Sequence, residues 1–163
     1  MQKICFSILT LLAFLASTEL AHGQVYKTAV GARLGYPVSA SVKHFISDES
    51  ALEAYAGIRP YLNYFGLNAS LAYLYHQPID AVDNLQWYVG AGGSVFFYNY
   101  SFVNDFASIG FGVNGYLGLD YVLDDYPVNL TIDWVPSLIL GNNPLSTFGF
   151  GYGALGIRYV LGD

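Results

Sequence analysis

Charged residues are scarce in this chain of 163 residues. They make up 11% of it, whereas soluble domains carry about 25%. An ordinary soluble enzyme is therefore not the expected class of protein. Only six residues are Lys or Arg against 12 Asp or Glu, for a net charge of −6. This shortage of positive charge argues against a nucleic-acid partner.

Cysteine is nearly absent, and the single one, Cys5, lies in a segment typical of a secretory signal peptide. In this segment Lys3 precedes an apolar run at 4–16, and small residues precede position 24. We expect residues 1–23 to be a cleaved signal peptide and residues 24–163 to form one domain. That domain would hold no thiol, which excludes disulfides, thiolate metal ligands and cysteine nucleophiles.

The chain also lacks an apolar run of about 18 residues, which excludes a helical membrane span. Its 15 Tyr, 11 Phe and 18 Gly favour strands and turns. Apolar and polar residues instead alternate with a period of two, which is typical of strands with one apolar and one polar face. The alternation is clearest at 85–97, 109–121 and 128–140.

Eight such segments follow one another along the chain. They are 27–36, 38–46, 51–59, 66–76, 85–97, 109–121, 128–140 and 153–161. Short acidic connections alternate with the longer loops 98–108 and 141–152, apart from a tight turn at Tyr36-Pro37. This layout predicts an all-β fold, an eight-stranded antiparallel up-and-down transmembrane β-barrel with both termini in the periplasm.

The face that carries the charge distinguishes a membrane barrel from a soluble one. In a membrane barrel the apolar face points outward and the polar face lines the lumen. Here one face is apolar almost without interruption, and the charged residues fall on the other, which suits a lumen. The predicted lumenal residues are Lys27, Arg33, Lys43, Glu53, Arg59, Asp120, Asp133 and Arg158.

Buried charges must be paired, and the expected strand register allows two pairs. Lys43 pairs with Glu53, and Arg158 pairs with Asp133, with Lys27 joining the second pair. Asp120 is placed in that same second cluster. We expect this network to be structural or gating, and the lumen to be largely plugged, because eight strands enclose little space.

Two further details of the predicted strands can be checked against a structure. Pro136 lies inside the segment 128–140, where it forfeits a ladder hydrogen bond, so we expect a bulge there. Inward-facing glycines should make room for large inward-facing rings. The glycines are those at 90, 92, 110, 112 and 118, and the rings are Tyr88, Phe96 and Tyr116.

Several wall segments carry a family resemblance that covers nearly the whole mature chain. These are residues 34–37, 42–45, 115–121, 127–134 and 156–159. They resemble segments of the small eight-stranded outer-membrane barrels of the OmpA/OmpX transmembrane type, and of an uncharacterised family of such barrels. The resemblance implies a Gram-negative outer membrane, lipid as the surroundings, assembly by the barrel-insertion machinery and no established activity.

No catalytic, cofactor or metal site is expected. Two stretches, 110–115 and 151–156, have the glycine spacing of a dinucleotide fingerprint, but neither opens a helix, which that site requires. The mature chain has two histidines, His44 and His76, both near the expected periplasmic strand ends. Neither has the ligand spacing of a metal site or a nucleophile beside it.

We therefore expect a monomeric barrel with a structural or surface-interaction role. The loops 98–108 and 141–152 form the surface that would meet an extracellular ligand. Three alternatives remain at this point. They are a narrow channel or porin for small solutes, a soluble periplasmic lipocalin-like binding barrel with its apolar face inward, and a lipid-modifying enzyme of the outer leaflet.

Overall fold

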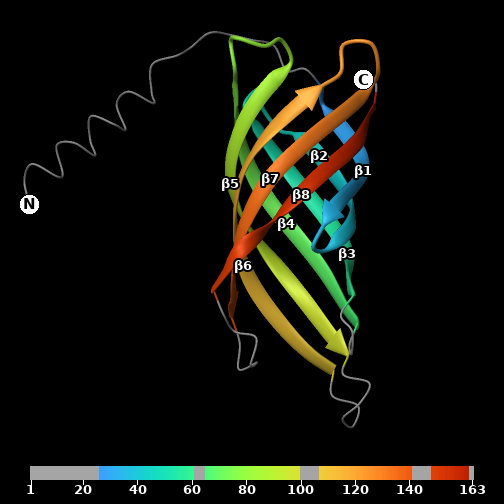
Figure 1. The fold of residues 1–163 in the computed structure, drawn as a ribbon, viewed down its shortest axis with the longest axis vertical. Coiled ribbons are helices and arrows are strands. Elements are labelled where there is room, and N and C mark those ends of the chain that lie inside the picture. The colour runs from blue at the N-terminus through green and yellow to red at the C-terminus, as the bar shows by residue number, and fades with distance from the viewer. Residues whose placement is uncertain (1–25, 61–64, 100–106, 141–147, 162–163) are drawn as a thin grey trace, which may run out of the picture.

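The structure is a computed structural model that describes residues 26–60, 65–99, 107–140 and 148–161. These residues form eight strands in one closed antiparallel barrel (Figure 1). The strands are β1 (Thr28–Gly35), β2 (Val38–Phe45), β3 (Ser50–Pro60), β4 (Phe65–Pro78), β5 (Leu85–Asn99), β6 (Ala107–Val122), β7 (Val128–Leu140) and β8 (Phe148–Leu161). Each strand pairs with its neighbours in sequence, and β8 pairs with β1 to close the wall. The predicted fold class is confirmed.

The strand boundaries differ from the prediction mainly at the longer loops. β8 begins at Phe148 rather than at residue 153, and β5 and β6 extend to Asn99 and back to Ala107. The predicted loops 98–108 and 141–152 are therefore shorter than expected. Glycine alternates with aromatic residues at 148–153, so this stretch has no polar and apolar contrast to mark it as a strand. The rest of both loops, and the predicted signal peptide, lie outside the described residues.

The predicted bulge at Pro136 is confirmed. Against β8, the register shifts by one residue between Val135 and Ser137. Against β6, on the other side of the strand, the register is the same before and after the proline. On the β6 side the ladder omits Val135 and Pro136 without a shift, and the extra residue on the other side lies in β8, so β7 continues through the proline.

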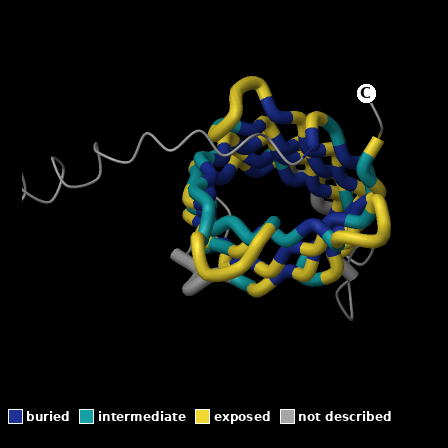
Figure 2. The backbone as a smooth tube through the Cα atoms, turned by 90° about the horizontal axis from the view of Figure 1, so that it is seen from above, coloured by how far each residue is buried: buried dark blue, intermediate teal, exposed yellow. Residues whose placement is uncertain are grey.

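The wall of the barrel is apolar outside and polar inside. Buried and exposed residues alternate along the strands (Figure 2). Outward side chains such as Leu71, Phe111 and Ile132 are more than half exposed, whereas Arg33 and Arg158 are almost fully buried inside. A lipocalin-like binding barrel requires the reverse arrangement, so that alternative is wrong. Within the described ranges no helix is long and apolar enough to cross a membrane.

Two of the five predicted glycines make room for aromatic rings, whereas a Cβ atom at Gly90 or Gly92 would meet the β4 backbone and Leu74 or Ala72 instead. A Cβ atom at Gly118 would lie 2.7 Å from Cζ of Tyr88 and 2.7 Å from Cβ of Asp133. A Cβ atom at Gly112 would lie 2.8 Å from the ring of Phe96. Directly beside these two glycines the interior therefore has no space even for a methyl group.

Gly118→Ala should destabilise the folded barrel by about 1–3 kcal/mol, because the new methyl group would meet the Tyr88 ring and the β7 backbone. Urea unfolding of the refolded protein in lipid vesicles measures the change. Gly93→Ala is the matched control, since its Cβ atom would have one neighbour, at 3.9 Å. Equal unfolding midpoints for the two variants would contradict the close packing.

Candidate functional site

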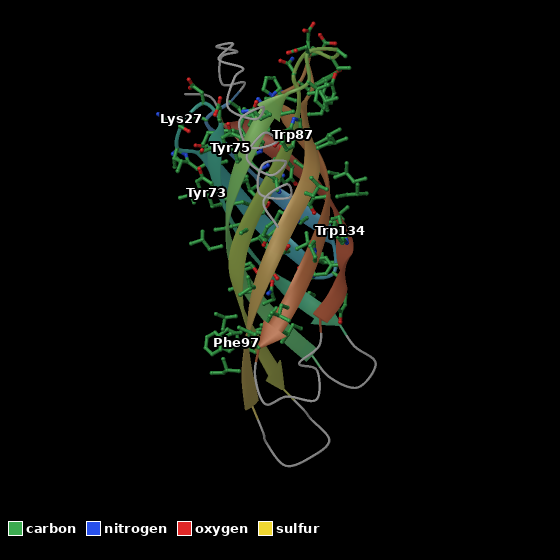
Figure 3. The ribbon with its side chains drawn as sticks, turned by 90° about the vertical axis from the view of Figure 1, so that its left-hand side faces the viewer. Lys27, Tyr73, Tyr75, Trp87, Phe97 and Trp134 are labelled. Atoms are coloured by element: carbon green, nitrogen blue, oxygen red, sulfur yellow. The ribbon has the colours of Figure 1, made fainter. Side chains whose placement is uncertain are left out.

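Six of the eight charged residues predicted to line the lumen do project into it and are buried. These are Arg33, Lys43, Glu53, Asp120, Asp133 and Arg158. Lys27 does not: it is exposed at the end of the barrel (Figure 3), and the prediction for it is wrong. The pairing of β1 with β8 ends at Thr28, so the chain at Lys27 no longer follows the strand alternation. Arg59 lies in β3, but its side chain is outside the described part of the structure.

Glu53 is the centre of the larger ionic cluster. Its Oε1 accepts from Nη1 of Arg33 at 2.9 Å and also from the guanidinium of Arg158. Arg33 in turn donates through Nη2 to Oδ1 of Asp133 at 2.8 Å. The hydroxyl of Tyr88 donates to the second oxygen of Asp133 at 2.5 Å. One carboxylate oxygen therefore pairs with two arginines, and one arginine bridges two carboxylates.

Arg158 is held by hydroxyl and amide groups as well as by Glu53. Its Nε donates to Oγ of Ser41 at 2.8 Å, and its Nη1 donates to Oγ1 of Thr131 at 3.0 Å. Nη1 also contacts Oδ1 of Asn129 at 3.2 Å, and the Asn129 amide nitrogen donates to Asp120. Asn129 thus joins the larger cluster to a second one.

The second cluster is built around Asp120, close to the end of the barrel where β1 begins. Its Oδ2 lies 2.7 Å from Nζ of Lys43 and accepts from the hydroxyl of Tyr26 at 3.1 Å. The ring of His76 packs against Phe45, and its Nε2 lies 3.5 Å from Asp120. Burial and the nearby carboxylate raise the pKa of Tyr26 well above its ordinary value. Its phenol therefore stays protonated and acts as a donor.

The predicted pair of Lys43 with Glu53 is wrong, although the two residues face each other directly across β2 and β3. The ammonium group of Lys43 reaches across the lumen to Asp120 on β6 instead. The register places the Cα atoms of Lys43 and Glu53 side by side, but a long side chain inside a narrow barrel can reach several other strands.

The predicted pair of Arg158 with Asp133 is also wrong, because the register of β7 with β8 places Arg158 opposite Asn129 and Asp133 opposite Ala154. Arg158 pairs with Glu53 on β3, and Asp133 pairs with Arg33 on β1. Lys27 joins neither, because its side chain is exposed.

The described interior holds three cations and three carboxylates, joined by the ion pairs above. With His76 neutral, the network has no net charge. It connects strands on opposite sides of the barrel, since β1 and β3 are bridged to β7 and β8, and β2 to β6. The arrangement cross-links the wall and compensates charges that are removed from water.

A third group of polar side chains, not predicted from the sequence, continues beyond Arg33 toward the loops. We call it the loop-side polar cluster, and it comprises Tyr55, Asn68, Ser70, Ser94, Asn114 and Tyr116. The hydroxyls of Tyr55 and Tyr116 lie 2.8 Å apart, and those of Ser70 and Ser94 lie 2.6 Å apart. The guanidinium of Arg33 lies 4.9 Å from the ring centre of Tyr55, which connects the clusters. In the sequence, the signal that could have indicated this cluster was the small uncharged polar residues at every second position of these strands.

The remaining predicted features lie in the wall rather than in a site. The glycine-rich stretches 110–115 and 151–156 fall within β6 and β8, not at the start of a helix. His44 faces outward and its Nδ1 lies 2.8 Å from Oγ1 of Thr28. Among the residues that the structure describes, no group of three His, Cys, Asp or Glu is placed to hold a metal ion.

The geometry defines a closed eight-stranded barrel with an apolar exterior and a charge-paired interior. No family profile and no curated protein sequence matches the chain. Among solved structures, it is similar to the N-terminal β-barrel domain of Pseudomonas aeruginosa OprF, with a TM-score of 0.56. The two share 17% sequence identity, and the match covers 83% of this chain and 95% of that one. At this identity the likeness shows the shared fold alone, and it confirms the predicted eight-stranded barrel.

Glu53→Gln should destabilise the barrel by about 3–5 kcal/mol, because it leaves two buried arginines facing a neutral amide. Asp133→Asn should cost less, since Arg33 keeps its contact with Glu53. Lys27→Ala, at an exposed position, should leave the urea midpoint unchanged. A larger loss for Asp133→Asn than for Glu53→Gln would contradict the central role of Glu53.

Proposed function

We propose that this protein is an integral outer-membrane β-barrel with a polar, largely plugged lumen and a structural or surface-interaction role. The observation that carries the proposal is the inverted polarity of the wall. Large apolar side chains on all eight strands are exposed, while six charged side chains are buried inside. An exposed apolar surface of this extent needs lipid around it.

Aromatic residues on the outer wall support the same proposal. Tyr73, Tyr75 and Trp87 lie toward the end of the barrel where Lys27 is found, and Phe97 lies near the opposite end (Figure 3). Aromatic rings at two levels are typical of the two interfaces of a membrane barrel. The resemblance to the OmpA/OmpX type of barrel agrees with an outer membrane of a Gram-negative bacterium.

The connections between strands support the orientation that we propose. The described chain begins and ends at the same end of the barrel, since Thr28 pairs with Leu161. The acidic turns at 46–49, 79–84 and 123–127 lie at this end. Outer-membrane barrels have their short turns in the periplasm. We therefore assign this end, with both termini, to the periplasm and the loops at 98–108 and 141–152 to the cell surface.

The partners that fit this proposal are the surrounding lipid, the barrel-insertion machinery during assembly, and an extracellular ligand at the surface loops. We propose a monomer without catalytic activity. In support, the buried His76 contacts Lys43 and Asp120 near the periplasmic end, and His44 faces outward. Neither histidine is placed as a general base beside a hydroxyl nucleophile in the outer leaflet.

Cells that express the protein should retain it in the outer-membrane fraction, and its band on a denaturing gel should shift on boiling. A closed barrel with a cross-linked interior resists detergent until it is heated. Fractionation and paired boiled and unboiled samples test both points. Recovery of a soluble band without a shift would refute the membrane proposal.

A narrow channel is the second candidate, because polar side chains form a connected file from Tyr26 to the loop-side polar cluster. The ion pairs fill this file, so we expect the purified protein to give no steady conductance in a planar bilayer. Defined single-channel steps from the intact protein would favour the channel over the plugged barrel.

A further inference from the structure

The barrel wall differs greatly in height from one side to the other. β1 and β2 have 8 residues each, whereas β5 and β6 have 15 and 16. At about 3.3 Å per residue and a tilt near 40°, these strands rise about 20 Å and about 40 Å. The apolar band of an outer-membrane barrel is about 25 Å tall. The β1–β2 hairpin therefore ends inside that band, well short of the loop-side ends of β5 and β6 (Figure 1).

The turn of this hairpin has the chemistry of a turn within lipid. It consists of Tyr36 and Pro37 and carries no charge, in contrast to the acidic turns at the other end. Pro37 has no N–H group that would need a partner in lipid. The flanking Leu34 and Val38 are 48% and 46% exposed on the outer wall.

Beyond this turn the described part of the wall has no strand between β3 and β8, and we call this place the lateral notch. The register of β1 with β8 ends at Gly35 and Ala154, although β8 continues to Phe148 and remains paired there with β7. On the other side, β3 continues past the last residue that pairs with β2, Ile58. No strand of the described chain lies between β3 and β8 at this level.

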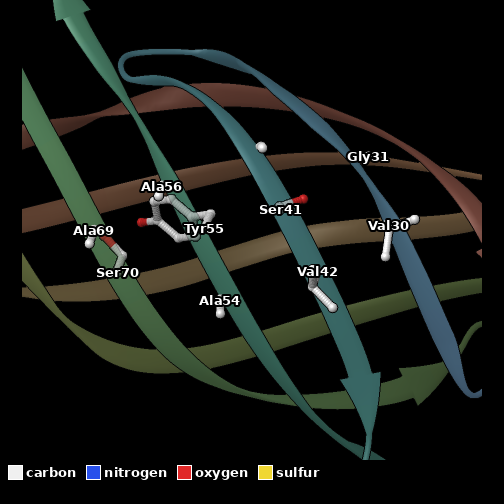
Figure 4. A pocket seen from close by; sticks show the side chains of 10 residues that line it. Val30, Gly31, Ser41, Val42, Ala54, Tyr55, Ala56, Ala69 and Ser70 are labelled. Atoms are coloured by element: carbon white, nitrogen blue, oxygen red, sulfur yellow. The ribbon is translucent and has the colours of Figure 1, made fainter.

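An apolar groove on the outer wall lies directly below the lateral notch (Figure 4). Its volume is about 500 Å³, and it runs over β1 to β4. Its outward side chains are small, with alanines at 40, 54, 56 and 69 beside Val30 and Val42. Ala40 pairs with Ala56, one outward position below Val38 and Ile58. The groove thus ends one outward position below the notch, with Val38 and Ile58 between the two.

Inside the barrel, beside the notch, buried polar groups lack partners. Ser39 and Asn68 flank Gly57 on the inner wall. They are 5% and 3% exposed, and neither the Ser39 hydroxyl nor the Asn68 amide nitrogen has a hydrogen-bond partner. Oδ1 of Asn114 is also without one. Each buried polar group that has no hydrogen-bond partner lowers the stability of the folded protein by about 1–3 kcal/mol.

We propose that the lateral notch admits one membrane amphiphile, with its chain in the alanine groove and its head inside the loop-side lumen. The head is uncharged and hydroxylated, because a hydroxyl can accept from Asn68 and donate to Asn114. An ionised head would be an unpaired charge beside a network whose charges are already balanced. This inference rests on the proposed membrane location.

The test uses the refolded protein in bicelles of chain-deuterated phosphatidylcholine, with protonated alanine methyl groups. Monolauroylglycerol is the uncharged probe, and laurate is the charged one with the same chain. We expect saturable nuclear Overhauser contacts from the monolauroylglycerol chain to Ala40 and Ala56, with shifts at the Ser39 and Asn68 amides. Laurate should leave those two amides unshifted.

Ala56→Leu fills the groove and should weaken the apparent affinity for monolauroylglycerol at least tenfold. Ala91→Leu makes the same change at an exposed position of β5, outside the groove, and should have no effect. Asn68→Leu should abolish the head-group shifts while chain contacts persist.

Contacts to Ala91 that match those to Ala56 and do not saturate would mean ordinary surrounding lipid, and they would overturn the proposal. Equal amide shifts with laurate would overturn the assignment of an uncharged head. Boiled and unboiled portions of the same sample, run on a denaturing gel, test the proposed function independently of this result. A protein that shows no heat shift fails as a membrane barrel, whereas one that shifts without binding fails only here.

Discussion

The neutralisation of charge across the lumen is the constraint on which this barrel depends. Glu53 shows it most directly, because a single carboxylate oxygen receives both Arg33 and Arg158. In a wall whose outer face is apolar, polar side chains have only the interior to occupy. Eight strands leave too little room for these charges to keep full hydration shells, so they pair with one another. The inward glycines follow from the same shortage of space, since Tyr88 reaches Asp133 over Gly118.

The fold could be predicted because the face of a barrel wall on which a side chain lies depends only on whether its position in the strand is odd or even, which we call its parity. Once Ile109 to Tyr121 alternate in polarity, each residue is assigned to a face without knowledge of its neighbours. The assignment of residues to faces failed where alternating residues do not differ in polarity, and where the strand pairing ends. The start of β8 alternates glycine with aromatic residues, and Lys27 precedes the first residue that β8 holds in register.

The sequence predicted which charged residues lie in the interior, but it did not predict which of them pair with one another. Parity placed Lys43, Glu53 and Asp120 inside, as observed. It could not show that Lys43 passes over the directly opposite Glu53 to reach Asp120, because that choice depends on the strand stagger and on side-chain length. The loop-side polar cluster was missed because serine and asparagine at inward positions look like ordinary small residues.

The ion pairs and the short hairpin divide the barrel into two parts that differ in structure. Arg33 lies two residues before Gly35, where β1 ends, so its pairs with Glu53 and Asp133 lie just below the lateral notch. Below this level, paired charges and packed rings project into the lumen. At and above it, the Ser39 hydroxyl, the Asn68 amide nitrogen and Oδ1 of Asn114 have no hydrogen-bond partner, and the described wall lacks one hairpin. The proposed plug on the periplasmic side and the proposed lateral entry from the membrane are compatible, because lateral access does not require a path along the axis.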